Sequence, residues 1–178
     1  MVFTLLLKHH ANRSPAGIGF FLLPKPKRMK SLAKKVKRIA LVAHDKKKRD
    51  LVDWAYYNRE LLSKHQLIAT GTTGTLLEER LDTPVKKLLS GPLGGDQQLG
   101  AMIAEGKVDV IIFFWDPLNS HAHDSDVKAL IRLAVAWNII IACNRTTADF
   151  ILTSPLLESN YDIMAPDFSA YSNRALEA

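Results

Sequence analysis

The stretch VDVIIFFW, Val108 to Trp115, is the clearest β-strand in this sequence of 178 residues. Apart from one aspartate, it consists of β-branched and aromatic residues, with no alternation between hydrophobic and polar positions. Such a run is typical of a strand that is buried on both faces, as in a parallel sheet with a layer of helices on each side. The segment therefore points to an α/β domain.

The segments around this strand alternate between strand and helix patterns. Short hydrophobic runs predict strands over residues 38–44 (RIALVAH), 66–70 (QLIAT) and 139–144 (IIIACN). Helical spacing predicts helices over residues 46–65, 75–81, 96–106, 124–138 and 146–154. The segment VKKLLS, residues 85–90, is ambiguous between strand and loop, and YDIMAPD, residues 161–167, is expected to be extended. This alternation predicts a single-domain, doubly wound (Rossmann-like) parallel sheet with helices on both faces.

Charge separates the N-terminal region from the rest of the chain. Residues 1–44 contain ten Lys or Arg and no acid, whereas residues 45–178 contain 14 basic and 18 acidic side chains. We therefore expect a basic, poorly ordered N-terminal extension over residues 1–36 and the folded domain over residues 37–178. Basicity confined to an extension, without interleaved aromatic residues, argues against a nucleic-acid partner.

Other classes of protein are excluded on composition. No hydrophobic run in the sequence reaches the roughly 18–20 residues that span a bilayer, so no membrane partner is expected. The single cysteine, Cys143, rules out a disulfide framework within the chain and fits a reducing compartment, which predicts a cytoplasmic protein. A signal or transit peptide over the N-terminal residues is a weaker interpretation.

Polar and small residues follow several of the predicted strands. His44 and Asp45 end the first strand, residues 70–74 (TGTTG) end the second, residues 90–91 end the ambiguous segment, and Asp116 follows VDVIIFFW. The carboxyl ends of parallel strands lie at one edge of a sheet, where ligands bind near a topological switch point. The sequence therefore predicts one site that combines these residues.

Two of these motifs could bind an anion. In ATGTTGTLL, residues 69–77, glycines allow backbone N–H groups to approach an anion, threonine hydroxyls add donors, and a helix follows. An N-capped turn without a ligand explains the same residues equally well. In HDKKKRD, residues 44–50, His44 is a candidate ligand for a phosphate or hydroxyl group, and Lys48 could balance its charge.

The loop FFWDPLNSHAHDSD, residues 113–126, brings together Asp116, His121, His123, Asp124 and Asp126. A His-x-His-Asp sequence is a weak indication of a metal site, because no Glu or Cys partner stands at a recognised spacing. The alternative is that Asp124 or Asp126 simply caps the following helix.

The stretch LLSGPLGGDQQLG, residues 88–100, surrounds Asp96 with glycines. Asp96 could be only the N-cap of the helix that follows. Glycines 91, 94 and 95 favour a further role, because they would let a substrate come close to an uncovered carboxylate. A carboxylate so placed can act as a general base.

Five stretches together resemble the methylglyoxal synthase family: IALVAHD, ATGTTG, LLSGPLGGDQQLGAMIAEGKVDVIIFFWDPL, HDSDVKALIRLA and TADFILTSP. They cover about residues 38–167. The resemblance implies conversion of dihydroxyacetone phosphate to methylglyoxal and inorganic phosphate, a bypass of glycolysis, without a metal or organic cofactor. It also implies a homohexamer and allosteric inhibition by inorganic phosphate.

The same resemblance implies a role for individual residues. Asp96 corresponds to the catalytic base, His123 contacts the substrate oxygens, Asp126 supports proton movement, and Asp45 and Asp116 organise the polar site. The residues expected to bind substrate are His44, Lys48, Thr70, Gly71, Thr72, Thr73, Ser90, Gly91 and His123.

Two residues of this sequence, Arg174 and His121, do not match a functional position of the family. A C-terminal arginine that reaches a neighbouring subunit's phosphate in the family is matched here only by Arg174, one position off. His121 has no counterpart and is interpreted as incidental.

Two alternatives to the enzyme remain at this stage. One is a non-catalytic domain of the same fold that senses phosphate or another ligand, as in carbamoyl phosphate synthetase. Retention of Asp96 together with His44, His123 and Asp126 argues against it. The other is a metal-dependent hydrolase built on the loop at His123 and Asp124, which activity in excess chelator would exclude.

Overall fold

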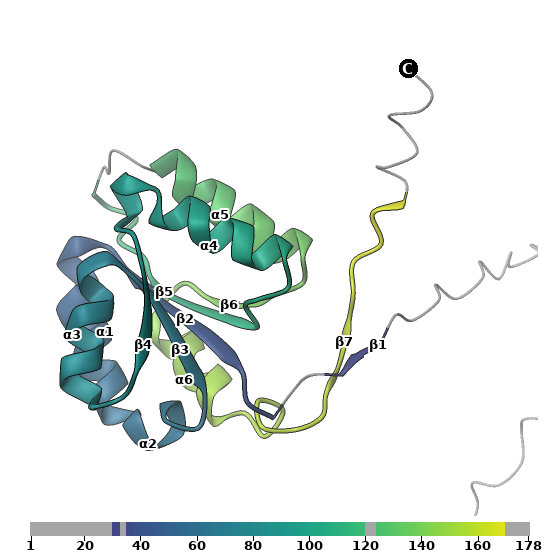
Figure 1. Cartoon of the computed structure of the whole chain (residues 1–178), viewed down its shortest axis with the longest axis horizontal. Helices are drawn as coiled ribbons and strands as arrows, with labels where there is room; N and C mark the ends of the chain where they lie inside the picture. Colours follow the sequence, from purple (N-terminus) through teal and green to yellow (C-terminus); the bar gives the residue numbers. More distant parts are fainter. Residues whose placement is uncertain (1–29, 33–34, 120–123, 170–178) are drawn as a thin grey trace, which may run out of the picture.

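A parallel sheet of five strands forms the centre of the computed structural model, which describes residues 30–32, 35–119 and 124–169 (Figure 1). The spatial order of the strands is β4-β3-β2-β5-β6, and each neighbouring pair is parallel. Their bounds are β2 Arg38–Ala43, β3 Gln66–Thr70, β4 Val85–Leu88, β5 Val110–Phe114 and β6 Ile140–Ala142. The chain adds strands on one side of β2 and then on the other, which confirms the predicted doubly wound arrangement.

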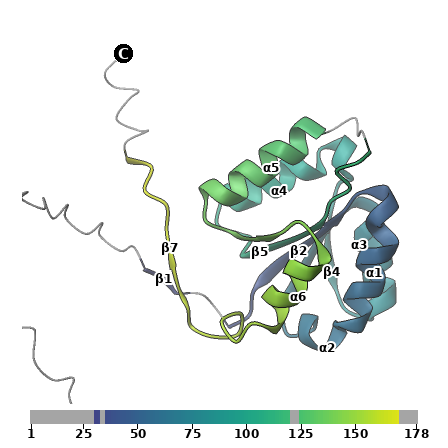
Figure 2. The ribbon, with the colours of Figure 1, turned by 180° about the vertical axis from the view of Figure 1, so that it is seen from behind.

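Helices cover both faces of this sheet (Figures 1 and 2). On one face lie α1, α3 and α6, and on the other lie α4 and α5. The α-helices are α1 Lys48–Tyr57, α2 Arg59–Leu62, α3 Gly71–Leu81, α4 Gly95–Ala104, α5 Asp124–Ala136 and α6 Arg145–Thr153. Two short 3₁₀ helices, η1 Asp45–Lys47 and η2 Gly91–Leu93, follow the ends of β2 and β4.

Strand β5, which lies within the hydrophobic stretch VDVIIFFW, contributes side chains to both hydrophobic cores. Ile112 and Phe114 of β5 belong to the cluster on the side of α1, α3 and α6. Ile111 and Phe113 belong to the cluster on the side of α4 and α5. All five residues of β5 are buried, because successive side chains point to opposite faces and each face meets helices. This double burial explains why the segment is hydrophobic without interruption.

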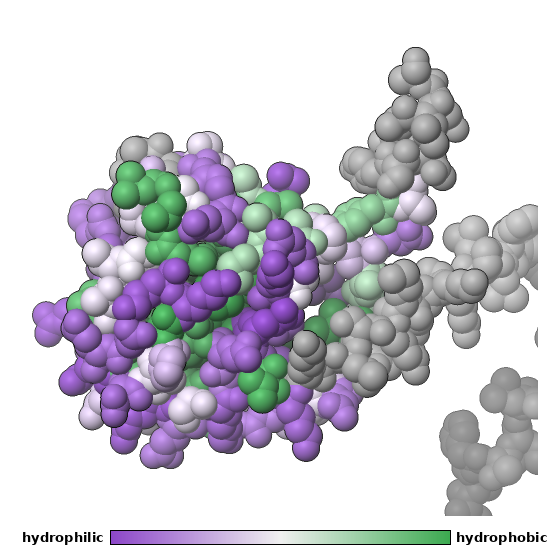
Figure 3. Space-filling view, viewed as in Figure 1, coloured by the Kyte–Doolittle hydropathy of each residue, from purple (hydrophilic) through white to green (hydrophobic). Residues whose placement is uncertain are grey.

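The ambiguous segment 85–90 contains a strand, and it lies at an edge of the sheet. Val85 of β4 is buried, whereas Lys86 and Lys87 are exposed. Lys87 forms an ion pair with Glu78 of α3 at 2.5 Å. The face of the molecule in Figure 3 is largely hydrophilic, with smaller hydrophobic areas between the hydrophilic residues. Charged residues on an edge strand protect it from pairing with another chain.

Three helix boundaries differ from those expected. The helix predicted over 46–65 is divided at Asn58 into α1 and α2. The helix predicted to begin at residue 75 begins at Gly71, so the glycine-threonine segment is its first turn rather than a loop before it. Asp96 is not an N-cap, because α4 begins at Gly95 with Gly94 in the cap position and no side-chain cap hydrogen bond.

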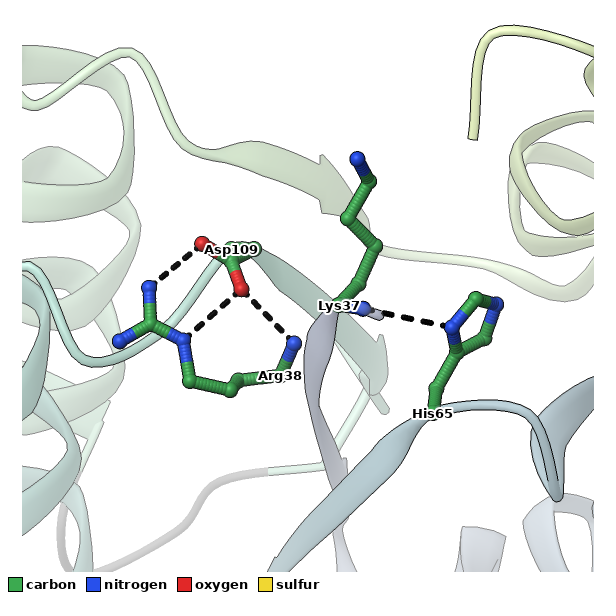
Figure 4. Close-up of polar contacts among 4 residues, drawn as sticks. All are labelled: Lys37, Arg38, His65 and Asp109. Carbon is green, nitrogen blue, oxygen red and sulfur yellow. Dashed lines mark hydrogen bonds and ion pairs between the residues drawn. The ribbon is translucent and has the colours of Figure 1, made fainter. Parts of the chain in front are cut away.

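An ion pair fixes the sheet at the ends of the strands away from these motifs (Figure 4). The backbone N–H and Nε of Arg38 donate to Oδ2 of Asp109 at 2.8 and 2.9 Å, and Nη2 of Arg38 donates to Oδ1 at 2.6 Å. Burial raises the pKa of Asp109, but the hydrogen bonds and charge of Arg38 outweigh it and hold that pKa below its ordinary value. Beside this pair, the backbone N–H of Lys37 donates to Nδ1 of His65.

A short two-stranded ribbon stands apart from the central sheet (Figures 1 and 2). In it, β1 Lys30–Leu32 pairs antiparallel with β7 Asp162–Met164. β1 lies inside the extension predicted over residues 1–36, while residues 1–29 lie outside the described residues. The boundary between extension and catalytic domain therefore stays a prediction. Within the described part of the chain, no helix is both long and apolar enough to cross a membrane.

Candidate active site

A cavity of about 250 Å³ opens at the carboxyl edge of the sheet, where the sequence predicted a site. It lies beside the end of β2, the strand at which the order of the sheet reverses. The residues that line it are Val42, Ala43, His44, Asp45, Lys48, Thr70, Gly71, Thr72, Thr73, Ser90, Gly91, Pro92, Asp96, Phe113 and Val127. The cavity thus brings together nine of the residues with predicted binding or catalytic roles, and also Asp45. They come from the ends of β2, β3 and β4 and from the starts of α1, α3 and α4.

The remaining predicted residues lie elsewhere. Asp116 is buried directly behind His44 and does not line the cavity. Asp126 is half-buried in the first turn of α5, and the next residue, Val127, is the one that lines the cavity. His121, His123 and Arg174 lie outside the described residues, so their predicted roles stay predictions.

His44 is held by two backbone groups at the end of the neighbouring strand, β5. Its backbone N–H donates to the carbonyl oxygen of Phe114 at 3.3 Å, and its Nδ1 accepts from the backbone N–H of Asp116 at 3.1 Å. The ring also meets Phe113 edge-on, with centroids 5.1 Å apart. A nitrogen that accepts from an amide carries no proton, so the neutral ring has its proton on Nε2. His44 is therefore a fixed hydrogen-bond donor in the cavity wall.

Lys48 brings a positive charge to the cavity wall. Its Nζ lies 2.6 Å from Oδ1 of Asp45 and donates to Oγ1 of Thr72 at 2.7 Å. Asp45 lies in η1 and Thr72 in the first turn of α3, so the lysine joins the end of β2 to the start of α3. The role predicted for Lys48, to balance the charge of an anion held by the threonine segment, stays a prediction.

The first turn of α3 supplies donors for an anion. The first N–H groups of an α-helix have no intrahelical acceptor and carry the positive end of the helix dipole. In α3 the N–H of Gly71 donates to the carbonyl oxygen of Leu89, and the next two N–H groups belong to Thr72 and Thr73, which line the cavity. Oγ1 of Thr73 is completely buried, and it has no hydrogen-bond partner among the described residues. A buried hydroxyl of this kind requires a partner, which an anionic ligand would provide.

Asp96 is buried in the first turn of α4, with 5% of its surface exposed. Its carboxylate is thus shielded from bulk water in the cavity wall, where such a group can act as a general base.

The glycines before Asp96 have a different purpose from the one predicted. Gly94 and Gly95 do not line the cavity. Gly94 has a φ of +101°, which favours glycine, and a Cβ at Gly95 would overlap the carbonyl oxygen of Leu89. These glycines therefore allow the first residues of α4 to pack closely against the backbone of Leu89, after the end of β4. They position Asp96 rather than make room for the substrate.

Two polar residues of this region were not singled out by the sequence interpretation. Asn119 donates from Nδ2 to Oδ2 of Asp116 at 2.5 Å and accepts from Nζ of Lys46 at 2.7 Å. Gln98 accepts the backbone N–H of Leu89 at its Oε1, at 2.8 Å. Both lie within quoted motifs, but a hydrogen bond to a distant backbone or buried carboxylate leaves no spacing signal in a sequence.

No metal-binding group of three or more His, Cys, Asp or Glu side chains occurs among the residues the structure describes. The histidines of the 113–126 loop, His121 and His123, are outside those residues. The donors that line the cavity are amides, hydroxyls, an ammonium group and an imidazole, a set that suits a phosphate ester.

The comparisons with known proteins agree with this geometry. The family model described as MGS-like domain matches residues 50–143. A methylglyoxal synthase of Coxiella burnetii is 53% identical over 141 residues, which are 79% of this chain and 99% of that protein. A methylglyoxal synthase of Leptospira interrogans is 59% identical over 126 residues, which are 71% of this chain and 85% of that protein.

A solved structure extends the agreement to the backbone. The crystal structure of a methylglyoxal synthase from Elizabethkingia anophelis matches with a TM-score of 0.77 and 56% sequence identity. The match covers 82% of this chain and 95% of that one. Identity at this level over nearly the whole length of these relatives shows that the chain belongs to the methylglyoxal synthase family.

Proposed function

We propose that this chain is a methylglyoxal synthase, a carbon–oxygen lyase that converts dihydroxyacetone phosphate to methylglyoxal and inorganic phosphate. The observation that carries the proposal is that one cavity holds both a buried carboxylate, Asp96, and the anion donors of a helix start, Thr72 and Thr73. The reaction needs a base for a carbon acid and a cradle for a leaving phosphate within the length of a three-carbon substrate.

In the first step, the carboxylate of Asp96 removes a proton from the hydroxymethyl carbon next to the substrate carbonyl. Negative charge then develops on the carbonyl oxygen of the resulting enediolate. Nε2–H of His44 donates to that oxygen, because its proton is fixed there by the amide of Asp116. A donor that is already oriented needs no reorganisation as charge develops, which is why such groups accelerate proton abstraction.

In the second step, phosphate leaves from the enediol. The hydroxymethyl C–OH becomes an aldehyde as its proton is lost, a double bond forms to the phosphate-bearing carbon, and the C–O bond electrons depart with the phosphate. The enol so formed takes up a proton on the terminal carbon, loses its O–H proton and becomes methylglyoxal. The amides at the start of α3, the Thr73 hydroxyl and Lys48 meet the charge of the departing phosphate.

The remaining assignments follow family resemblance. His123 contacts substrate oxygens, and Asp126, in the first turn of α5, assists proton movement. Thr70, Ser90 and Gly91 complete the phosphate site, and Asp45 and Asp116 hold Lys48 and His44 in place. No cofactor takes part in these steps. We also infer a cytoplasmic homohexamer that is inhibited allosterically by inorganic phosphate.

Substitution of Asp96 by Asn tests the base assignment. The amide keeps the shape of the side chain but cannot accept the proton, so methylglyoxal formation should be abolished while inorganic phosphate still binds. A rate near that of the wild type would refute the assignment. Retained phosphate binding in a wild-type chain that forms no methylglyoxal would favour the alternative, a non-catalytic phosphate-sensing domain of the same fold.

A further inference from the structure

Two consecutive residues after β4, Leu89 and Ser90, connect the helix of the proposed base to the phosphate cradle, which is the first turn of α3 with Thr72 and Thr73. The carbonyl oxygen of Leu89 accepts the backbone N–H of Gly71 at 3.1 Å, and Gly71 begins α3. The next carbonyl, that of Ser90, accepts the backbone N–H of Gly95 at 2.9 Å, and Gly95 begins α4. The helix that carries the anion donors and the helix that carries Asp96 are therefore both bonded to this short segment.

Gln98 adds a side-chain contact to the same segment. Its Oε1 accepts the backbone N–H of Leu89 at 2.8 Å. Its own backbone N–H donates to the carbonyl oxygen of Gly94 at 3.0 Å, so the residue is anchored within the first turns of α4, two positions after Asp96. The amide of Leu89 lies beyond the last residue of β4, and the bond from α4 takes the place of a ladder bond there.

We propose that Gln98 is a positioning residue, which clamps the Leu89–Ser90 segment to α4 and so sets the separation between the Asp96 carboxylate and the phosphate cradle. This inference rests on the proposed function for its catalytic consequence, although the clamp itself is a property of the fold. Gln98 is exposed and does not line the cavity, so it acts through the segment it holds and not by contact with substrate.

Loss of the hydrogen bond between Gln98 and Leu89 should affect the rate of catalysis more than the stability of the fold. Removal of an exposed hydrogen bond leaves the core clusters unchanged. A displacement of the cradle relative to the base changes the alignment of the reacting bonds, and a misplacement of about 1 Å can lower a rate about 100-fold. We therefore expect kcat to fall about tenfold without the Gln98 acceptor.

The chain provides a matched control in the preceding residue. Gln97 is also an exposed glutamine in the first turns of α4, and its side chain forms no hydrogen bond with the described residues. Gln98→Met removes the acceptor with little change in size, Gln98→Glu retains an oxygen that accepts the Leu89 amide, and Gln97→Met repeats the first change where no clamp exists. Gln98→Asn, whose side chain is one methylene too short to reach, replaces Gln98→Met if that variant fails to fold.

Two measurements on the full chain decide the proposal. The first is hydrogen exchange at the Leu89 amide, which should be faster in Gln98→Met and unchanged in Gln98→Glu and Gln97→Met. The second is steady-state kinetics with dihydroxyacetone phosphate and competition by inorganic phosphate. We expect Gln98→Met to lower kcat about tenfold while the inhibition constant of phosphate changes less than about threefold, with both other variants near the wild type.

The results that would overturn the clamp differ from the result that would overturn the proposed function. An unchanged Leu89 exchange rate in Gln98→Met, or a wild-type kcat in it, overturns the clamp. So does a Gln98→Glu variant that is as slow as Gln98→Met. A wild-type enzyme that forms no methylglyoxal instead overturns the proposed function, and the clamp is then decided by hydrogen exchange alone.

Discussion

The backbone N–H of Asp116 donates a 3.1 Å hydrogen bond to Nδ1 of His44 and thereby fixes the tautomer of a ring in the cavity wall. The two residues follow neighbouring parallel strands, β2 and β5, at the switch point of the sheet. The ring donor is thus aligned by main-chain geometry, which a side-chain substitution at position 116 would not remove.

Replacement of His44 by Ala should lower kcat/KM about 100- to 1,000-fold, the usual effect of removing a donor to a developing oxyanion. His65 is a second buried histidine, placed at the opposite edge of the sheet, and His65→Gln is the matched control. Its kcat/KM should equal that of the wild type. Steady-state kinetics on both variants checks the prediction, and equal losses in the two would contradict it.

Thr73→Val should separate ligand binding from stability. The Thr73 hydroxyl is buried and makes no hydrogen bond among the described residues, so its loss should leave the free energy of unfolding unchanged or higher. Phosphate affinity should fall about tenfold, because a donor to the anion is lost. Calorimetric titration with inorganic phosphate and urea unfolding test the two halves, with the exposed Thr75→Val as control. Undiminished phosphate binding would remove Thr73 from the cradle.

Gly95→Ala should destabilise the protein by about 3 kcal/mol or prevent folding, because the new methyl group would overlap the carbonyl oxygen of Leu89. Gly100→Ala, on the same helix, is the control. There the nearest atom, Cδ1 of Leu133, lies 3.1 Å from the added Cβ and belongs to a side chain that can move. Chemical denaturation of the two variants should rank Gly95→Ala well below Gly100→Ala, and the reverse order would show that α4 starts elsewhere.

The pH dependence of stability should include a contribution from His65. Burial lowers the pKa of His65, Lys37 and Lys64 lower it further, and Glu158 raises it in part. A histidine whose pKa is lower in the folded state binds protons more readily when unfolded. Its contribution to stability is therefore complete above about pH 6.5 and is lost as the pH falls below that value.

Urea unfolding of the wild type and of His65→Gln at about pH 7.5 and pH 5.5 measures this contribution. The free energy of unfolding should drop more on acidification in the wild type than in the variant. An equal drop in the two would assign the acid sensitivity to other groups.

Much of the fold could be predicted because its signals are local. The double burial of β5 and the turn residues after each strand are visible in the sequence, and parallel topology then brings His44, Thr70 and Ser90 to one edge. The sequence predicts that α3 starts at residue 75, because glycine and threonine favour loops. In the structure these residues form the first helical turn, which is stabilised by packing and by the hydrogen bond from Gly71 to Leu89.

The finer parts of the site depend on contacts that sequence patterns do not record. The glycines at 94 and 95 were assigned to the substrate, although they accommodate the backbone of Leu89. The partners of Asp116 and of the Leu89 amide, Asn119 and Gln98, are set by three-dimensional proximity alone. Such contacts have no periodicity, so only the folded chain reveals them.

The most direct test of the central claim is incubation of the full chain with dihydroxyacetone phosphate, with methylglyoxal and free phosphate measured together. We predict that the two products appear at equal rates, and that Asp96→Asn, which keeps the cavity and its phosphate cradle, releases neither. Release of phosphate without methylglyoxal would indicate a phosphatase, and the absence of both from the wild type would contradict the proposed enzyme.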